Sequence, residues 1–241
     1  MKKRIFIYFG IISILLAFLP FFSFEAFVSL SGRLYIDKPG YILIKEKDDY
    51  IYYSNGNITE YLTEDEIPNY VFEYLIGLED QNFYNHKGYD IKRIVKSLID
   101  NTISNKIVGG GSTITQQVSK NIFFNQEKSI SRKLGEAFGA FDLEKNYSKN
   151  EIFELYVNTA YFGDGYYGIY AASHGYYNKD PKDLTLDESS MLAGVPNAPS
   201  VYAPTVNIGL ARQRQKQVLN SMLTYGYISE KDKSDVLNNI K

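Results

Sequence analysis

The sequence predicts a mainly α-helical protein, with a small β hairpin or linker ahead of the helical body and one transmembrane helix at the N-terminus. From residue 63 onward, Ser/Thr capping boxes recur, and each is followed by apolar residues at helical spacing. The chain lacks the alternation of strand and helix patterns that a parallel sheet requires. Residues 5–24 carry no charge. With 241 residues, 44% of them apolar, there is ample material for a core.

The uncharged N-terminal segment has the length of a membrane span. A helix over residues 5–24 would rise about 30 Å, which matches the hydrocarbon core of a bilayer. Lys2, Lys3 and Arg4 precede it, so the positive-inside rule places residues 1–4 in the cytoplasm and the chain after Glu25 outside. A cleaved signal peptide is the alternative. We favour an uncleaved signal anchor, because the run is long for a signal peptide and no A-x-A-like site follows it.

Residues 25–62 have the character of a membrane-proximal linker. Two short β-prone runs, residues 41–44 and 50–53, are separated by Lys47, Asp48 and Asp49. Residues 54–57 read Ser-Asn-Gly-Asn, which is a strong turn signal. We therefore expect a small hairpin or linker here that positions the rest of the protein.

Residues 63–241 are predicted to form one helical domain. A capping box at Thr63 and Glu66 precedes a helix running to about Leu78, and Asp90 can cap a helix from Ile91 to about residue 103. Further helices are expected after the capping boxes at 148/151 and 185/188, and over residues 211–225 and 229–240.

Composition excludes several classes of function. The net charge of −2 and the pI near 5.8 give no support for a nucleic-acid partner. Without cysteine there is no disulfide, thiolate metal site or cysteine nucleophile. His86 and His174 lie far apart and lack a second cluster of metal-ligand residues, so a protein-built zinc site is not expected.

The first candidate segment spans residues 79–90 and reads EDQNFYNHKGYD. Glu79 stands at the end of a predicted helix, with Phe83 and Tyr84 close behind it. Such an acid is a candidate general base, because apolar rings favour the protonated form of a carboxyl group. A Glu-Asp pair at a helix end is more often simply solvated. The ordered set that also includes Asp80 and His86 is much more specific.

The second candidate segment is a glycine-rich turn, residues 109–111, that runs through Ser112 into a predicted helix, with Thr113 and Gln116 spaced as a capping box. A turn of this kind presents free amide N–H groups and the positive end of the helix dipole, which favours anions such as a pyrophosphate. It does not match a nucleotide-binding P-loop. An ordinary flexible loop with a helix cap is the alternative, but Gln116, Gln117 and Lys120 add amides and a cation to the same short element.

The third candidate segment covers residues 128–141. Its apolar residues are expected on one helical stripe, which leaves Glu136 on another face near Arg132 and Lys133. This spacing predicts that Glu136 is not forced into the core. The alternative reading is an exposed helix glutamate that pairs with Arg132 four residues earlier. The apolar stripe comprises Ile130, Leu134, Ala137, Phe138 and Phe141.

From about residue 70 to residue 204, the chain resembles the family 51 glycosyltransferases. This is the lysozyme-like domain of class A penicillin-binding proteins and of monofunctional peptidoglycan transglycosylases. The matching segments, in order, are residues 79–90, 110–121, 132–144, 149–158 with 161–163, and 192–204. Family members often have a basic residue at the position of Lys128; where it is Arg, Lys gives up the bidentate phosphate geometry but keeps the charge. A further departure is the run Tyr-Tyr-Asn-Lys at 176–179, in place of a Y-F-G-K-like run.

The resemblance implies a lysozyme-like helical fold and an inverting enzyme. It would polymerise lipid II into glycan strands with release of undecaprenyl diphosphate. Glu79 would be the general base, and Glu136 a second essential acid that orients nearby cations or helps to hold a divalent metal. No tightly bound cofactor is expected, and a divalent cation (Mg or Mn) is left open. The substrate-binding residues implied are Asp80, Phe83, His86, Ser112, Thr113, Gln116, Gln117, Lys120, Lys128, Arg132 and Lys133.

The same resemblance implies location and partners. We expect a single-pass protein of the bacterial cytoplasmic membrane, with its catalytic domain on the outer face. Its partners would be lipid II, the growing glycan chain and the membrane, with transpeptidases and other cell-wall proteins as further candidates. No Ser begins an S-x-x-K motif, so the chain looks monofunctional. The alternatives are a lysozyme-like peptidoglycan hydrolase, which also uses paired acids, and an inactive membrane-anchored scaffold.

Overall fold

The computed structural model describes residues 43–46, 49–52, 62–104, 110–124 and 130–238. The predicted tail and signal anchor, residues 1–24, and Lys128 lie outside these ranges. Within them, no helix is both long enough and apolar enough to cross a membrane.

The linker region contains the predicted hairpin. Strands β1 (Leu43–Glu46) and β2 (Asp49–Tyr52) pair antiparallel, with Leu43 opposite Tyr52 and Glu46 opposite Asp49. The β-prone runs in the sequence thus pair with each other, as expected for two short strands separated by a polar turn.

The rest of the described chain is helical, which confirms the mainly α prediction. The first elements are the 3-10 helix η1 (Glu64–Glu66), α3 (Asn69–Glu79), η2 (Phe83–Asn85), α4 (Ile91–Ser104), α5 (Ile114–Phe123), α6 (Ile130–Asn146), α7 (Lys149–Thr159) and α8 (Gly168–Tyr177). They are followed by η3 (Pro181–Asp183), α9 (Leu186–Gly194), η4 (Val195–Asn197), α10 (Pro199–Tyr202), α11 (Ile208–Thr224) and α12 (Glu230–Asn238).

Capping boxes determine where several helices begin. Thr113, Ser148 and Thr185 each form the predicted box, at the starts of α5, α7 and α9. The box at Thr63 is also formed, but it caps only the single turn η1, and α3 begins at Asn69. Pro68 explains the difference, because proline disfavours helical geometry at the residue before it and has no N–H to donate.

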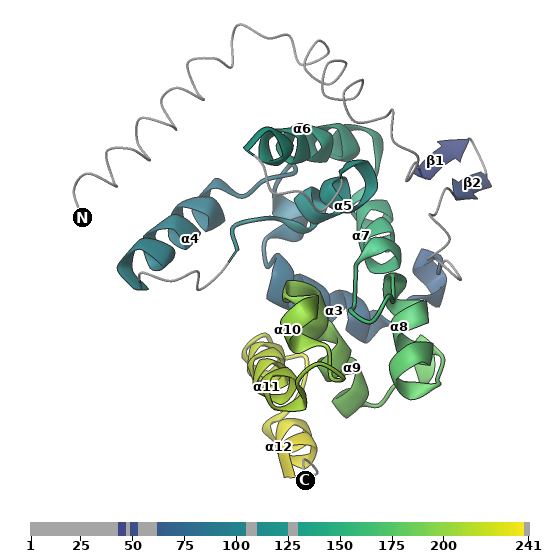
Figure 1. The fold of residues 1–241 in the computed structure, drawn as a ribbon, viewed down its shortest axis with the longest axis vertical. Coiled ribbons are helices and arrows are strands. Elements are labelled where there is room, and N and C mark those ends of the chain that lie inside the picture. The colour runs from purple at the N-terminus through teal and green to yellow at the C-terminus, as the bar shows by residue number, and fades with distance from the viewer. Residues whose placement is uncertain (1–42, 47–48, 53–61, 105–109, 125–129, 239–241) are drawn as a thin grey trace, which may run out of the picture. The chain divides into compact units, whose positions relative to one another are not determined.

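The core is built around α5 and α7. Helix α5 packs between α6 and α7, and the three lie side by side in Figure 1. Ile114, Val118 and Ile122 follow one another at four-residue spacing on α5, and all three are buried. Residues 152–159 of α7 are buried as a continuous run. The N-terminus of α5, which carries the second candidate segment, is therefore anchored directly in the core.

Helix α6 does not bury the predicted apolar stripe. Phe141 is 43% exposed, whereas Glu136 is fully buried, together with Ala140 and Leu143. The prediction that Glu136 stays outside the core is therefore wrong. The reason is the close approach of α5 and α6: a Cβ at Gly135 would collide with Phe124, and one at Gly139 with Ser119. The face bearing these glycines packs inward, because only residues without side chains fit there.

The C-terminal helix α11 packs against α9 and α3. Val218, Leu219 and Met222 fill this contact, and all are buried. The buried Gln215 amide donates to the Asp187 carbonyl at 2.8 Å and to Ser190 Oγ at 3.0 Å, which fixes α11 on α9. This packing brings a distant part of the chain to the end of α3, where Glu79 stands.

Candidate active site

The chain reverses sharply after α3, and Phe83 anchors the reversal. Its ring is fully buried and lies edge-on to His86, with ring centroids 6.1 Å apart, and 6.3 Å from the ring of Phe153 on α7. The Phe83 N–H donates to the Asp80 carbonyl at 2.9 Å. Phe83 therefore anchors this turn in the core, and the two acids at the start of the segment are buried rather than solvated.

Asp80 joins the first candidate segment to the second. Its Oδ2 lies 2.7 Å from His86 Nε2 and accepts from the Ile114 N–H at 3.0 Å. Ile114 is the first residue of α5, so a carboxylate here also benefits from the positive end of the helix dipole. Asp80 and His86, both expected to bind substrate, thus bond each other, while Asp80 Oδ1 and His86 Nδ1 are buried without a hydrogen-bond partner among the described residues.

Thr113 and Gln116 form the start of α5. Thr113 Oγ1 donates to the Gly88 carbonyl at 2.7 Å and accepts from the Gln116 N–H at 3.1 Å, while Gln116 Oε1 accepts from the Thr113 N–H at 3.0 Å. Both side chains are buried. Thr113 Oγ1 and Gln116 Oε1 thus serve the cap, whereas Ser112 and Gln117 bond other candidate residues, Lys133 and Glu79.

Glu79 is buried but only partly bonded. Its Oε2 accepts from Gln117 Nε2 at 3.0 Å, and its Oε1 lies 3.6 Å from Nη2 of Arg214 on α11. This Oε1 is buried and has no hydrogen-bond partner in the described part of the chain. The carboxylate therefore has one oxygen fixed by an amide and a second that can still accept a proton.

Sequence reasoning missed Arg214. Its guanidinium reaches the site from 135 residues further along the chain, and it also donates to Gln217 Oε1 at 3.0 Å. A weak signal was present: Arg214 lies three residues after Ala211 and four before Val218, both of which are buried on α11. That spacing puts an arginine beside the buried face of the helix, but it does not predict which residue the arginine contacts.

Tyr156 on α7 was also missed. Its side chain is fully buried, and its hydroxyl has no hydrogen-bond partner among the described residues. Burial raises the pKa of this phenol well above its usual value; the charge of Glu79 raises it further, and Arg214 and Arg93 oppose the shift. The phenol therefore stays neutral beside the candidate base. The chain has 22 tyrosines, and no sequence signal distinguishes Tyr156 from the others.

Glu136 is bonded at both oxygens. Arg132 Nη1 donates to Oε1, and Lys133 Nζ donates to Oε2 at 2.5 Å. Lys133 Nζ also donates to Ser112 Oγ at 2.8 Å, which links α6 to the glycine-rich segment. The expected pairing with Arg132 is present, but in the interior. A buried carboxylate held by two cations fixes the direction in which those cations point.

The charges of both glutamates, Glu79 and Glu136, act on the Lys120 ammonium group. Burial lowers the pKa of its ammonium group, the charges of Lys133 and Arg132 lower it further, and Glu136 and Glu79 oppose this. Lys120 in the last turn of α5 thus forms one cationic cluster with Arg132 and Lys133 at the start of α6. Lys133 connects this cluster to the Ser112 hydroxyl ahead of α5. We call these four residues the α5/α6 cationic cluster. Such a cluster stabilises anions through charge-assisted hydrogen bonds.

Among the described residues, no three His, Cys, Asp or Glu side chains gather into a group that could hold a metal ion. The divalent metal that Glu136 was expected to help hold stays a prediction. Both Glu136 oxygens already accept from cations.

Other conspicuous residues lie elsewhere. His174 Nε2 is 2.9 Å from Asp180 Oδ1, and Tyr176 donates from its hydroxyl to the Phe162 carbonyl at 2.8 Å. Neither forms a described contact with Glu79 or Glu136. The departure at residues 176–179 therefore falls on the end of α8, outside this site.

Several known proteins are similar to this chain in sequence. The family model described as "Transglycosylase" matches residues 48–223. Penicillin-binding protein 1F of Bacillus subtilis (strain 168) is 39% identical over 237 residues, covering 96% of this chain and 33% of the relative. Penicillin-binding protein 1A of Aquifex aeolicus (strain VF5) is 41% identical over 178 residues, 74% of this chain and 24% of that protein.

The similarity extends to other species. Penicillin-binding protein 1A of Neisseria lactamica is 42% identical over 173 residues, covering 72% of this chain and 22% of the relative. This chain thus spans a third or less of the length of these relatives. The crystal structure of penicillin-binding protein 1A from Haemophilus influenzae aligns with a TM-score of 0.36 and 28% identity over 52% of this chain and 16% of that one. A score this low adds no argument about the fold.

Proposed function

Because the chain belongs to the transglycosylase family, we propose that it is a peptidoglycan glycosyltransferase that joins lipid II molecules into glycan strands. The observation that carries the proposal is the buried Glu79, with one oxygen free of hydrogen bonds, in the electrostatic range of the α5/α6 cationic cluster. A base and an anion site together are what transfer from a diphosphate donor requires.

Glu79 would act as the general base. Its Oε1 accepts the proton from the 4-hydroxyl of N-acetylglucosamine on the acceptor, as that oxygen attacks the anomeric carbon of N-acetylmuramic acid on the donor. The bond from this carbon to the diphosphate breaks, and undecaprenyl diphosphate leaves with the electron pair. A single displacement inverts the anomeric configuration. Gln117 and Arg214 hold the carboxylate in place for the attack.

The leaving diphosphate needs positive charge. Lys120, Arg132 and Lys133 would supply it, because ionised donors bind phosphate oxygens most strongly. Glu136 cannot bind a phosphate itself, but it fixes the directions of Arg132 and Lys133. Lys128, outside the described residues, is proposed as a further cation. Phe83 and His86 would act by shaping the loop that carries Glu79.

Location follows from the substrate. Lipid II keeps its lipid tail in the bilayer, so we propose a membrane-anchored protein with the helical domain at the outer surface of the cytoplasmic membrane. The uncharged residues 5–24 support the anchor. Transpeptidases are proposed as partners, since glycan strands are later cross-linked.

The test is polymerisation of labelled lipid II by the full chain in detergent. Wild type should yield polymer, and Glu79→Gln should reduce the rate by about 10²–10⁴-fold. Lys216→Gln, which changes an exposed residue of α11, is the control and should polymerise at the wild-type rate. Assays with Mg, with Mn and with EDTA measure whether a divalent cation is needed.

Two other outcomes would contradict the proposal. Release of soluble muropeptides from mature sacculi, without polymer, would show a lysozyme-like hydrolase. Absence of any polymer from wild type in several detergents and metal conditions would favour an inactive scaffold.

A further inference from the structure

Three exposed tyrosines lie where the end of α11 meets α3. Tyr84, Tyr225 and Tyr227 are 54%, 45% and 39% exposed. The ring centroids of Tyr225 and Tyr227 are 6.3 Å apart. A Cβ at Gly77 of α3 would lie 3.4 Å from Tyr227 Cε2 and 3.7 Å from Tyr225 Cδ2, so both rings lie against the backbone of this buried glycine. We call Tyr84, Tyr225 and Tyr227 the tyrosine surface.

The turn after α11 holds two of these tyrosines in place. Gly226 has a φ of +76°, in the left-handed region that favours glycine. Its N–H donates to the Leu223 carbonyl at 3.0 Å, and the Tyr227 N–H donates to the Met222 carbonyl at 2.9 Å. These two bonds make a Schellman motif, which ends the helix in a fixed geometry. The residues that carry the two rings are thus positioned by backbone hydrogen bonds.

The third tyrosine brings polar groups to the surface. The Tyr84 hydroxyl donates to Asn150 Oδ1 at 3.4 Å, and Asn150 Nδ2 donates to Glu64 Oε1 at 2.6 Å. Burial raises the pKa of Tyr84, and the charges of Glu64 and of the Tyr227 phenol raise it further, so these groups lie within electrostatic range of one another. A carboxylate has about four acceptor sites. Glu64 is exposed, so it can accept further hydrogen bonds from a ligand.

The residue types of this surface indicate which ligand would fit. Aromatic rings have an electron-rich face, which suits the polarised C–H groups on the face of a sugar ring. A carboxylate and an amide beside the rings suit sugar hydroxyls and acetamide N–H groups. The one charge among the residues named above is the negative charge of Glu64, which disfavours phosphates. An uncharged polymer of N-acetylated sugars matches these properties.

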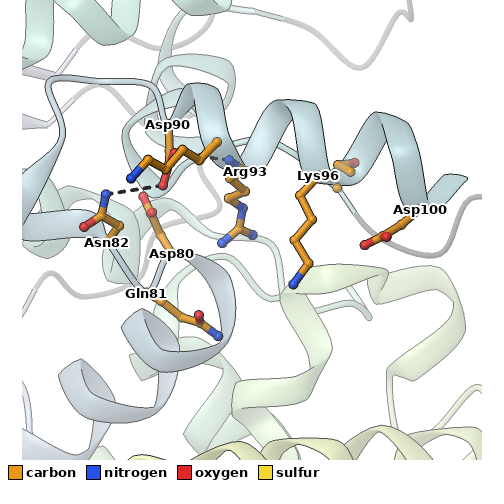
Figure 2. Close-up of a pocket in the computed structure, with 10 residues that line it drawn as sticks. Asp80, Gln81, Asn82, Asp90, Arg93, Lys96 and Asp100 are labelled. Atoms are coloured by element: carbon orange, nitrogen blue, oxygen red, sulfur yellow. Dashed lines mark hydrogen bonds between the residues drawn. The ribbon is translucent and has the colours of Figure 1, made fainter. Parts of the chain in front are cut away.

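The tyrosine surface is close to the proposed base along the chain. Gly77 precedes Glu79 by two residues on α3, and Tyr84 follows it by five. The pocket of about 370 Å³ beside Asp80, shown in Figure 2, has none of the three tyrosines in its lining. A ligand on the tyrosine surface would therefore not compete with one in that pocket. The reaction proposed above makes a strand of N-acetylated sugars at Glu79, which puts such a strand near the three rings.

We propose that the tyrosine surface binds the finished part of the glycan strand, outside the catalytic site. This inference rests on the proposed function and adds a second contact for its product. The sugar faces stack on the three tyrosine rings, while Glu64 accepts hydrogen bonds from acetamide N–H groups. The enzyme thereby retains sugars that have already moved away from Glu79.

A binding measurement tests the surface without catalysis. Calorimetry of the full chain in detergent uses chitohexaose, a β-1,4-linked hexamer of N-acetylglucosamine. Tyr84→Ser/Tyr225→Ser should weaken its binding at least about tenfold, since covering one aromatic ring is worth about a decade or more. Phe141→Ser, which removes a ring of similar exposure from α6, should bind like wild type. Unchanged binding by a double variant that melts at the wild-type temperature would overturn the proposal.

Further probes separate the ligand classes. Cellohexaose has the same linkage without acetamide groups and should bind more weakly than chitohexaose; equal affinity would overturn the assignment of an N-acetylated strand. Tyr225→Phe keeps the ring and should bind chitohexaose like wild type. If the double variant instead lost binding of hexalysine and kept that of chitohexaose, the surface would be a docking site for a basic peptide, and the proposal would be wrong.

Product length connects the surface to the reaction. With labelled lipid II, Tyr225→Ser should release shorter strands than wild type on a polyacrylamide gel, because the product dissociates earlier. Lys216→Gln should give strands of wild-type length. Wild-type strand length from a variant that binds chitohexaose weakly would overturn the retention of product. If wild type makes no polymer, the proposed function fails by itself, and the chitohexaose titration still decides whether the tyrosine surface binds glycan.

Discussion

Two buried glutamates, Glu79 and Glu136, are bonded in opposite ways. Glu79 Oε2 accepts a hydrogen bond from the Gln117 amide. Its Oε1 lies 3.6 Å from the Arg214 guanidinium and accepts no hydrogen bond from the described residues. Glu136 has both oxygens on cations of its own helix, Arg132 and Lys133. A carboxylate with an unoccupied oxygen can take a proton from substrate, whereas one that is fully bonded can only orient its partners. Burial alone does not distinguish a base from a structural acid.

The sharpest test of this contrast is Glu79→Gln. It should lower polymerisation by about 10²–10⁴-fold while leaving the melting temperature close to that of wild type, because the amide keeps the shape and few bonds are lost. Lipid II assays and thermal unfolding on the same preparation measure both. A large fall in melting temperature would show that Glu79 is primarily structural.

Glu136→Gln, by contrast, should mainly lower the stability of the protein. Removing one partner of a buried ion pair leaves the Arg132 guanidinium without its countercharge, at a cost of about 3–5 kcal/mol in the free energy of unfolding. Chemical denaturation measures this, with the exposed Asp235→Asn on α12 as control. If Glu136→Gln unfolded like wild type yet lost activity as completely as Glu79→Gln, the orienting role would be wrong.

Arg214→Gln should have a smaller effect on the base. Without the guanidinium, Glu79 is held only by Gln117, and kcat is expected to fall about tenfold, the worth of one charged contact, with little change in KM. Arg214→Lys should recover part of the rate because it keeps the charge. Equal kcat values for the two variants would mean that α11 contributes packing and no charge.

The smallest expected effect concerns pH. Because burial lowers the pKa of Lys120, its positive charge is lost at a lower pH than that of an exposed lysine. Polymerisation should therefore fall on the alkaline side as pH rises through this pKa. Lys120→Arg keeps its charge there and should move the alkaline limb to higher pH. An alkaline limb at the same pH in both proteins would exclude Lys120 as its origin.

Local signals predicted most helix starts correctly. The boxes at Thr113, Ser148 and Thr185 cap α5, α7 and α9. Each side chain accepts from the backbone N–H three residues later, and this bond does not depend on tertiary contacts. The box at Thr63 also forms, but it caps a single turn and not the long helix predicted, because Pro68 follows that turn. Motif order also singled out Glu79 and Glu136 as candidate acids; their roles stay predictions.

The sequence by itself determined the helical class and the caps, and it singled out the two candidate acids, since these depend on residue types and short spacings. Only the tertiary structure decided that Glu136 is buried, because that follows from the close contact of α6 with α5 at Gly135 and Gly139. It alone brought Arg214 to Glu79 and left the Glu79 Oε1 without a hydrogen bond. Contacts between residues 135 positions apart depend on how whole helices pack, and no local pattern carries that information.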